Sequence, residues 1–220
     1  LVANPSFEVA DFIKEILYII FRLQKPEILM SEDEIKCLAG YAAKTKKIAV
    51  EIGTYKGGSA AVISKALPDK AKLFTIDPYI PDSKIPSFHG HVLIAYLNVL
   101  KYGNIRKVNF LRDISSNAAK SWTEPIDLLW IDGSHHYEDV KNDFIIWSKF
   151  VQPGGYILFH DSNRKDLSRD TEWSENGWCG PTLVCHEIKN QMIGHYEHVQ
   201  SFKSINVFQK KFNPASGVCT

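Results

Sequence analysis

The chain lacks a long apolar run and a surplus of either charge. Its longest apolar stretch, Ile16 to Phe21, is far shorter than the roughly 20 residues that cross a membrane as a helix. The 26 Lys and Arg residues nearly balance the 25 Asp and Glu residues, and the net charge is +1. Such a balance gives no field that would attract nucleic acid or a membrane surface. We therefore expect neither as a partner.

Paired cysteine motifs are also missing. The four cysteines show no C-x-x-C or zinc-type spacing, and no signal-peptide pattern is visible. We therefore expect a reduced, cytoplasmic protein. A length of 220 residues suits one well-buried domain. We expect helices in residues 1–45 to pack on a main domain of residues 46–220.

The apolar pattern that is present predicts an α/β fold. Helical spacing runs from Phe7 to Arg22 and from Tyr137 to Val151, and a capping-box pattern at Ser31 to Glu34 predicts a helix over Glu32–Ala43. The stretch Val151 to Gly155 predicts a helix stop and a turn. Strands are predicted at Ile48–Ile52, Leu73–Ile76, Val108–Leu111, Leu128–Ile131, Tyr156–Phe159, His198–Phe202 and Ile205–Phe208. This alternation predicts a parallel sheet covered on both faces, which ends in an antiparallel hairpin.

The first strand leads into a glycine turn that predicts a nucleotide site. The strand brings Glu51 to the turn, Gly53 and Gly57 follow, and a helix begins near Ser59. The next apolar run ends at Asp77. A strand, a glycine turn, a helix and a second strand ending in an acid form one half of a nucleotide-binding α/β unit.

The spacing of this turn favours S-adenosylmethionine over a dinucleotide. A dinucleotide turn has the pattern G-x-G-x-x-G, whose second glycine lets the backbone approach a pyrophosphate. Tyr55 occupies that position here. Glu51 would lie badly beside a diphosphate, whereas it can face the ammonium group of a ligand with an amino-acid part. Asp77 can accept both ribose hydroxyls. An NAD-linked oxidoreductase stays the less favoured alternative.

Two acidic residues at strand ends predict a cation site. Asp132 and Asp161 each follow an apolar run, and if their strands are neighbours the backbones lie about 5 Å apart. Both carboxylates then reach one hard cation such as Mg²⁺ in the crevice beyond the strands. Asp127 lies at the far end of its strand and cannot join them. The alternative is that Asp132 caps the following helix and Asp161 begins a turn.

These motifs resemble those of a known family. Val50–Ala60 followed by Asp77 resembles motifs I and II of class I S-adenosylmethionine-dependent methyltransferases. Tyr55 and Ser59 are similar to the E-x-G-x-Y-x-G-x-S-A form of the catechol-type, metal-dependent O-methyltransferases.

A later stretch resembles a related group of enzymes. Ile131 to Glu138, followed by Pro153-Gly154-Gly155 and by His160-Asp161, is similar to the macrolide sugar O-methyltransferases and cephalosporin-hydroxylase-like proteins. Together the resemblances cover Ser31 to Phe208. They imply O-methylation of a small-molecule or sugar hydroxyl.

The resemblance also implies a fold and a cofactor site. The fold is a Rossmann-like, mostly parallel seven-stranded sheet of order 3-2-1-4-5-7-6, with helices on both faces and the last strand antiparallel. The implied residues around S-adenosylmethionine are Glu51, Gly53, Tyr55, Gly57, Ser59, Asp77, Asp113 and Asp132. For Asp113, which would border the adenine, the alternative role is to cap a helix.

By the same resemblance, His135 is the general base. A hydroxyl that attacks a methyl group at neutral pH must lose its proton, and a histidine can take it. His136 is the second candidate base, or a helix-start residue that faces solvent. A divalent cation held by Asp132, Asp161 and His160 would lower the pKa of the hydroxyl.

The chain departs from both groups beside Asp161. Catechol-type enzymes have Asp-Asn where this chain has Asp161-Ser162, and sugar-type enzymes have Glu-Asp where it has His160-Asp161. The third metal ligand is therefore open among His160, Ser162 and Asn163, and a metal-free site is a further alternative. The same departure leaves a non-catalytic S-adenosylmethionine-binding protein as an alternative function.

Two segments do not fit a minimal sheet. Pro78–Tyr102 combines a proline-rich loop with a helix-like run, and Ser162–Pro181 is polar. Long polar loops after a strand are commonly binding elements. We expect the second segment, with Trp173 and Trp178, to close over the acceptor. The apolar first helix can pack on its own domain or on a partner subunit, which leaves a homo-oligomer open.

Overall fold

The computed structural model describes residues 13–14, 16–21, 28–79, 90–164 and 179–211. These residues form one seven-stranded sheet of order β3-β2-β1-β4-β5-β7-β6. The strands are β1 Ile48–Ile52, β2 Lys72–Ile76, β3 Val108–Leu111, β4 Ile126–Ile131, β5 Val151–Phe159, β6 Tyr196–Phe202 and β7 Ile205–Lys210. Strands β1 to β5 pair in parallel, and β7 is antiparallel to both β5 and β6. The predicted fold class and the terminal hairpin are confirmed.

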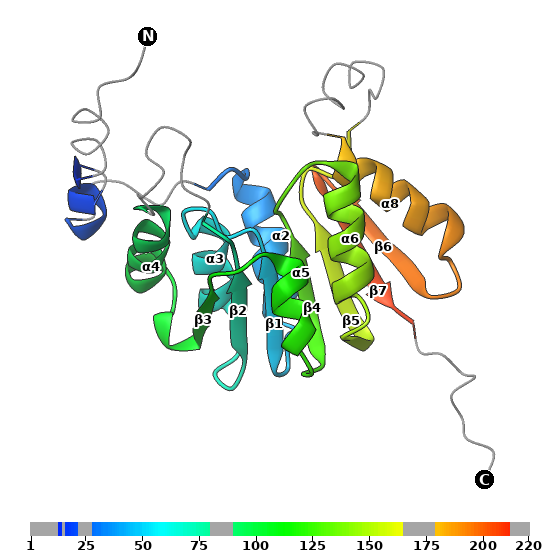
Figure 1. Ribbon diagram of the computed structural model, residues 1–220, viewed down its shortest axis with the longest axis horizontal. Helices are drawn as coiled ribbons and strands as arrows, with labels where there is room; N and C mark the ends of the chain where they lie inside the picture. Colours follow the sequence, from blue (N-terminus) through cyan, green and yellow to red (C-terminus); the bar gives the residue numbers. More distant parts are fainter. Residues whose placement is uncertain (1–12, 15, 22–27, 80–89, 165–178, 212–220) are drawn as a thin grey trace.

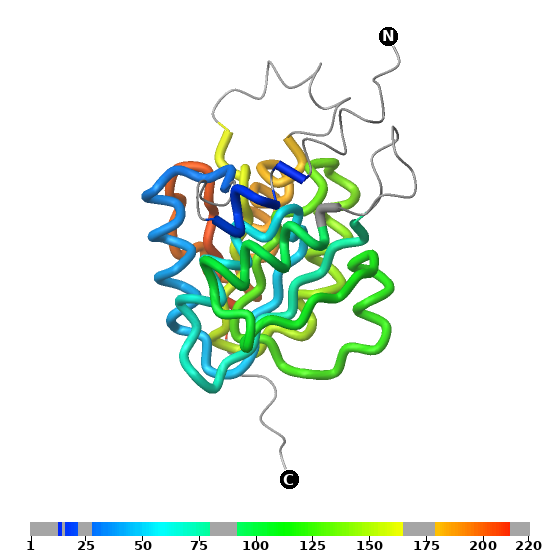
Figure 2. Tube along the Cα trace, turned by 90° about the vertical axis from the view of Figure 1, so that its left-hand side faces the viewer, coloured from blue at the N-terminus to red at the C-terminus, as the bar shows by residue number. Residues whose placement is uncertain are grey.

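Helices cover both faces of the sheet (Figures 1 and 2). One layer consists of α2 Glu32–Ala42, α3 Gly58–Ala66 and α4 Gly90–Tyr102. The other consists of α5 Ser115–Ala118, α6 Tyr137–Trp147 and α8 Gly180–Gln191. Two short 3₁₀ helices complete the described elements. η1 Ile105–Lys107 precedes β3, and η2 Ala119–Ser121 follows α5.

Each face of the sheet has its own apolar core, because successive side chains of a strand point to opposite faces. All six residues of β4 are buried. Leu129 of this strand belongs to one cluster with Phe144 and Trp147 of α6. Leu128 belongs to the other cluster with Ile63 of α3. Burial on both faces explains why the central strands β1 and β4 are almost entirely apolar, with one acidic residue each.

Helix α2 begins as the capping-box pattern predicts. The Ser31 hydroxyl accepts a hydrogen bond from the Glu34 backbone N–H, and the Glu34 carboxylate accepts one from the Ser31 backbone N–H at 2.8 Å. Two backbone donors at the helix start are thereby satisfied. Of the helix predicted over Phe7–Arg22, residues 13–14 and 16–20 are described and are helical.

The boundary between α6 and β5 differs from its prediction. The helix predicted to reach Val151 ends at Trp147, because Val151 pairs with Ile126 and opens β5. The turn predicted at 153–155 lies inside the same strand, where Gly154 has a φ of 83° and the register between β4 and β5 shifts. The helix stop was therefore placed too late, and the predicted turn is an irregularity within a strand.

The described helices are also informative about membranes. Over the described ranges, none combines the length and the apolar character that a membrane crossing requires.

The segment Pro78–Tyr102 contains α4, and residues 80–89 lie outside the described part of the chain.

Candidate functional site

The carboxyl ends of β1, β2, β4 and β5 meet at the upper edge of the sheet in Figure 1, and two cavities lie there. A cavity of about 610 Å³ has walls that include Asp77, Ile114, Ser115, Asp139 and Asp143. A cavity of about 280 Å³ has walls that include Met30, Ser59, His135, His160 and Asp161. Gly53, Tyr55, Asp132 and Gly133 line both cavities, so the two adjoin.

Gly53 brings the turn after β1 against the turn after β4. Its φ is +91°, and a Cβ atom there would lie 2.1 Å from the backbone oxygen of Asp132 and 2.6 Å from Cα of Gly133. The Asp132 backbone N–H donates to the Ile52 oxygen at 2.9 Å. Only glycine fits such an approach. The turn therefore fixes Asp132 at the boundary between the two cavities.

Asp77 binds the same turn from the end of β2. Its Oδ2 accepts from the backbone N–H groups of Thr54 at 3.0 Å and Tyr55 at 2.8 Å, and its Oδ1 accepts from that of Tyr79 at 2.7 Å. The residue predicted to hold a ribose thus lines the larger cavity and also holds the glycine turn. Because Oδ2 already accepts two hydrogen bonds and Oδ1 one, one lone pair of the carboxylate, on Oδ1, is left for a hydroxyl donor.

Glu51 is fully buried beneath the turn and does not line either cavity. Its Oε2 accepts from the Thr75 hydroxyl at 2.5 Å, and Oε1 has no hydrogen-bond partner among the described residues. Burial raises the pKa of this carboxyl to about 8, although hydrogen bonds from Ser59 and Thr75 lower it. A buried oxygen without a partner in a native protein indicates an unfilled contact.

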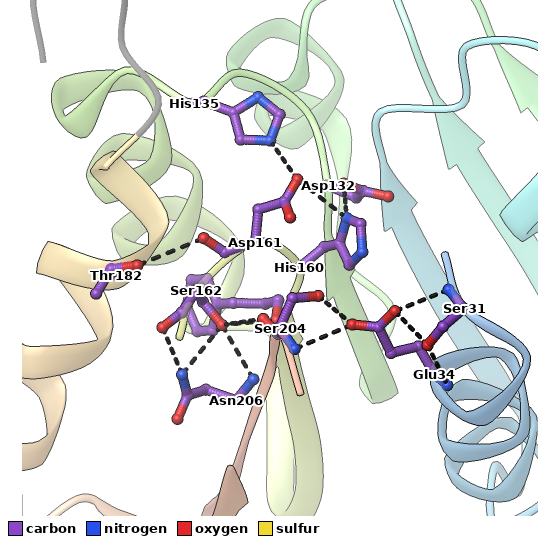
Figure 3. A network of polar contacts seen from close by, with 11 residues as sticks. Ser31, Glu34, Asp132, His135, His160, Asp161, Ser162, Thr182, Ser204 and Asn206 are labelled. Atoms are coloured by element: carbon purple, nitrogen blue, oxygen red, sulfur yellow. Dashed lines mark hydrogen bonds and ion pairs between the residues drawn. The ribbon is translucent and has the colours of Figure 1, made fainter. Parts of the chain in front are cut away.

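Four titratable side chains form a line at the ends of β4 and β5 (Figure 3). Nδ1 of His160 lies 3.0 Å from Oδ1 of Asp132 and 3.5 Å from Oδ2 of Asp161. Nε2 of His135 lies 3.1 Å from the same Oδ2. β4 and β5 are neighbours, paired through Ile131 and Phe159. The expectation that the two strands are neighbours is therefore confirmed, and Asp132 and Asp161 both lie beside Nδ1 of His160.

Asp161 orients His135. Burial would raise the pKa of Asp161, but the hydrogen bond from His135 and the charges of His160 and His135 outweigh burial and hold it below its ordinary value. An ionised carboxylate only accepts hydrogen bonds, so Nε2 of His135 carries a proton, and in the neutral ring the lone pair is therefore on Nδ1. This is the tautomer of a general base oriented by a carboxylate.

His160 is the most buried member of the line, with 5% exposure. Its ring packs beside Trp130, with the centroids 5.5 Å apart. Burial alone would lower the pKa of His160, but the hydrogen bond and charge of Asp132, together with the charge of Asp161, raise it to about 8.

The side chains that were predicted to bind a divalent cation do not fit one as they lie. Nδ1 of His160 faces the carboxylates as a hydrogen-bond donor, not as a lone pair. Ser162 is 1% exposed and its hydroxyl donates to the Phe159 oxygen at 2.9 Å. The Asn163 amide donates to the Lys203 oxygen at 2.7 Å. Across the described part of the chain, no group of three or more His, Cys, Asp or Glu side chains is arranged around a metal position.

Three other predicted site residues have structural contacts. A Cβ atom on Gly57 would lie 2.8 Å from the backbone of Ala95, so this glycine lets α3 and α4 approach. The Asp113 carboxylate accepts from the Ile114 N–H at 2.8 Å, at the start of α5. His136 is the exposed N-cap of α6. None of the three is among the described residues that line the two cavities.

Two residues of the site, Gly180 and Asp143, were not predicted from the sequence. Gly180 donates its N–H to the His135 oxygen at 3.0 Å, and a Cβ atom there would lie 2.3 Å from that oxygen, so it seats α8 against the candidate base. Asp143 accepts from the Ser115 hydroxyl in the wall of the larger cavity, and burial raises its pKa to about 6. An acidic residue on the apolar stripe of α6 was the available signal for Asp143.

The lid predicted over Ser162–Pro181 lies mostly outside the described residues. Trp173 and Trp178 are both among the residues that are not described.

A family match agrees with this geometry. The sequence profile of a family described as "Methyltransferase domain" matches residues 50–162, just over half of the chain. The chain therefore belongs to this methyltransferase-domain family. The matched region runs from β1 to the end of β5 and includes both the glycine turn and the line of four titratable side chains.

Curated relatives cover the same part of the chain. Uncharacterized protein R132 of Acanthamoeba polyphaga mimivirus is 30% identical over 125 residues, which are 57% of this chain and 53% of the relative. Uncharacterized protein y4gI of Sinorhizobium fredii is 29% identical over 130 residues, 57% of this chain and 14% of the relative. The matched part is thus about half of the first relative and a small part of the second.

Solved structures share the fold. An O-methyltransferase of Bacillus cereus in complex with SAH has a TM-score of 0.66 and 18% identity, and the match covers 96% of this chain and 93% of that one. The O-methyltransferase TomG of Streptomyces achromogenes, solved in complex with SAM and involved in tomaymycin synthesis, has a TM-score of 0.63 and 16% identity, with coverage of 96% and 92%. At such identities the likeness establishes the fold.

Proposed function

We propose that this methyltransferase-domain protein transfers the methyl group of S-adenosylmethionine to a hydroxyl of a small molecule or sugar. The observation that carries the proposal is the pairing of His135 with Asp161 at a cavity that adjoins a second cavity walled by Asp77. The two similar O-methyltransferases described above, one bound to SAM and one to SAH, support the choice of cofactor and acceptor atom.

The larger cavity suits the nucleoside of the cofactor. Asp77 offers the remaining lone pair of its Oδ1 to a ribose hydroxyl, and Ser115 and Asp143 supply polar atoms to the wall that would face the adenine. The amino-acid part would pass Gly53, which lines both cavities, toward the smaller one. The bound cofactor supplies a methyl group on a positively charged sulfur.

His135 performs the proton transfer in this proposal. An acceptor hydroxyl stays protonated at neutral pH, so it needs a base as it attacks. Nδ1 of His135 takes the proton, while Asp161 holds Nε2–H and stabilises the positive charge that forms on the ring. Leu29 and Met30 also line the smaller cavity, and their side chains suit an apolar part of the acceptor. Most of the remaining rate enhancement comes from placing the hydroxyl in line with the methyl group.

Assistance by a divalent cation stays a prediction. As they lie, Asp132 and Asp161 face Nδ1 of His160, so a cation could join the two carboxylates only if that ring moved or turned a lone pair toward the ion. No step of the proposed reaction uses a cation, and the proton transfer by His135 does not depend on one.

Two other functions serve as outcomes of the test. A non-catalytic cofactor-binding protein would bind S-adenosylhomocysteine without transferring a methyl group. An NAD-linked oxidoreductase is disfavoured by Tyr55, which stands at the position of the second glycine in a dinucleotide turn and has a φ of +47°.

Two measurements test the proposal. Calorimetric titration should show binding of S-adenosylhomocysteine and none of NADH. Radiolabelled S-adenosylmethionine should then label 3,4-dihydroxybenzoate or a methyl glycoside with the wild type but not with His135→Ala. His186→Ala is the matched control, since this histidine is exposed on α8. Failure to bind S-adenosylhomocysteine would sink the proposal, and binding without labelling of either acceptor class would favour the non-catalytic function.

A further inference from the structure

The imidazole of His160 occupies the point at which a cation would join Asp132 and Asp161. A single atom, Nδ1, lies 3.0 Å from one carboxylate and 3.5 Å from the other (Figure 3). The ring is 5% exposed and packs beside Trp130. Burial and packing therefore hold the ring in place, in addition to the two carboxylates.

The proton on Nδ1 decides what kind of contact this is. Carboxylate oxygens only accept hydrogen bonds, so the contact with Asp132 requires an N–H on Nδ1 of His160. A metal ion would require a lone pair on the same atom. The hydrogen-bonded ring and a divalent cation therefore exclude each other at this point.

The neighbouring residues do not build a cation site around the ring. The Ser162 hydroxyl donates to the Phe159 oxygen and accepts from the Asn206 backbone N–H at 3.0 Å, so it points away from Asp132 (Figure 3). The Asn163 amide is bound to the Lys203 oxygen. Among the described residues, a cation between the two carboxylates would therefore have only those two as protein ligands, and water would have to supply the rest of the roughly six oxygens that Mg²⁺ prefers.

We propose that His160 takes the place of a divalent cation in this site. Its ring joins Asp132 to Asp161, and through Asp161 it positions the imidazole of His135. His160 is thus a positioning residue, since it acts on the base through a carboxylate. The wild-type protein then has no cation site between Asp132 and Asp161, and removal of the ring uncovers one.

Binding of Mn²⁺, followed by electron paramagnetic resonance, tests this inference. The signal of the free ion disappears when the ion binds, and no cofactor or acceptor is needed. We expect wild type and the control His186→Ala to leave the signal of millimolar Mn²⁺ unchanged. His160→Ala should reduce that signal, with an affinity for Mn²⁺ at least about tenfold above the upper limit that the wild-type measurement sets, because two carboxylates are then left to share one cation. Adding Asp132→Asn to that variant should abolish the gain.

Two results would overturn the inference. One is Mn²⁺ binding by wild type that Asp132→Asn abolishes, which would mean that the ring and the cation coexist. The other is a folded His160→Ala variant that binds no Mn²⁺, which would mean that the ring is not what excludes the ion.

A second measurement, made on wild type alone, tests the inference even if His160→Ala does not fold. In wild type labelled with ¹⁵N-histidine, the Nδ1–H signal of His160 should persist when MgCl₂ is added, and its loss would contradict the inference. Neither measurement involves methyl transfer. A failure here is therefore distinguishable from a failure of the proposed function.

Discussion

Asp161 accepts a hydrogen bond from Nε2 of His135 at 3.1 Å while its own backbone has a φ of +46°. Left-handed backbone is uncommon outside glycine and costs about 1 kcal/mol or more. Aspartate tolerates it better than most residues. The two residues lie beyond β5 and β4, so their pairing depends on these strands being neighbours in the sheet. A costly backbone conformation at this position is consistent with a carboxylate that is aimed at a base.

Replacing this carboxylate should slow methyl transfer without weakening cofactor binding. Asp161→Asn removes the charge that fixes the tautomer of His135 and stabilises its protonated form. We expect kcat to fall by about 10²-fold to 10⁴-fold, with the Kd for S-adenosylhomocysteine nearly unchanged. Single-turnover kinetics and calorimetry measure the two quantities. Glu138→Gln, an exposed change at the start of α6, is the control. A normal kcat in Asp161→Asn would remove this residue from the proposed mechanism.

Asp77 and Asp113 should differ sharply in their effect on cofactor affinity. Both follow strands, but Asp77 lines the larger cavity and holds the glycine turn, whereas Asp113 binds the Ile114 N–H at the start of α5. We expect Asp77→Asn to weaken binding of S-adenosylhomocysteine by about tenfold or more, since a charge-assisted contact contributes roughly 1.5–3 kcal/mol. Asp113→Asn should change the Kd only slightly. Equal effects in calorimetric titrations would contradict the assignment of the ribose to Asp77.

The difference between these two acids illustrates what the sequence could predict. The order of the strands, the glycine turn and the meeting of Asp132 with Asp161 follow from alternation and from the rule that parallel strands end at one edge. Which side chain fills the space between two carboxylates does not follow from such rules. The position of His160 depends on its packing beside Trp130, which no spacing in the sequence encodes.

Contacts between distant segments were equally out of reach. Gly180 touches the backbone of His135 across 45 positions of sequence, and the requirement for glycine there arises only when α8 is seated. Glu51 was expected to face a ligand, but the same strand also packs against β2, and the carboxyl is buried against Thr75. Local patterns therefore predict where elements lie, whereas the interior partners of each polar group depend on the packed fold.

Gly53 and Gly40 form a matched pair for a test of the turn. A Cβ atom on Gly53 would collide with the Asp132 and Gly133 backbone at a φ of +91°, while one on Gly40, within α2, meets no atom within 4 Å. Gly53→Ala should lower the free energy of unfolding by several kcal/mol or prevent folding. Gly40→Ala should raise it by about 0.5–1 kcal/mol, since alanine favours a helix. Urea denaturation measures both. A Gly53→Ala variant as stable as wild type would mean that the two turns do not meet as described.

Because of Glu34, the free energy of unfolding should depend on pH in the acidic range. It is 7% exposed and joins α2 to the turn between β6 and β7, where its Oε1 accepts from the Ser204 N–H at 3.0 Å (Figure 3). Burial would raise its pKa, but hydrogen bonds from Ser204 and Ser31 outweigh burial and lower it from 4.5 to about 2.

Because the folded state has the lower pKa, this carboxylate stabilises the protein above pH 4.5, and the contribution is lost as the pH falls toward 2. The size is at most about 3 kcal/mol. Glu34→Gln should therefore be less stable than wild type at neutral pH, and the difference should shrink as the pH falls from about 5 to about 2. Urea denaturation across this range measures it, with the exposed Glu32→Gln as control. Parallel curves for wild type and Glu34→Gln would show that Glu34 is not ionised and bound as described.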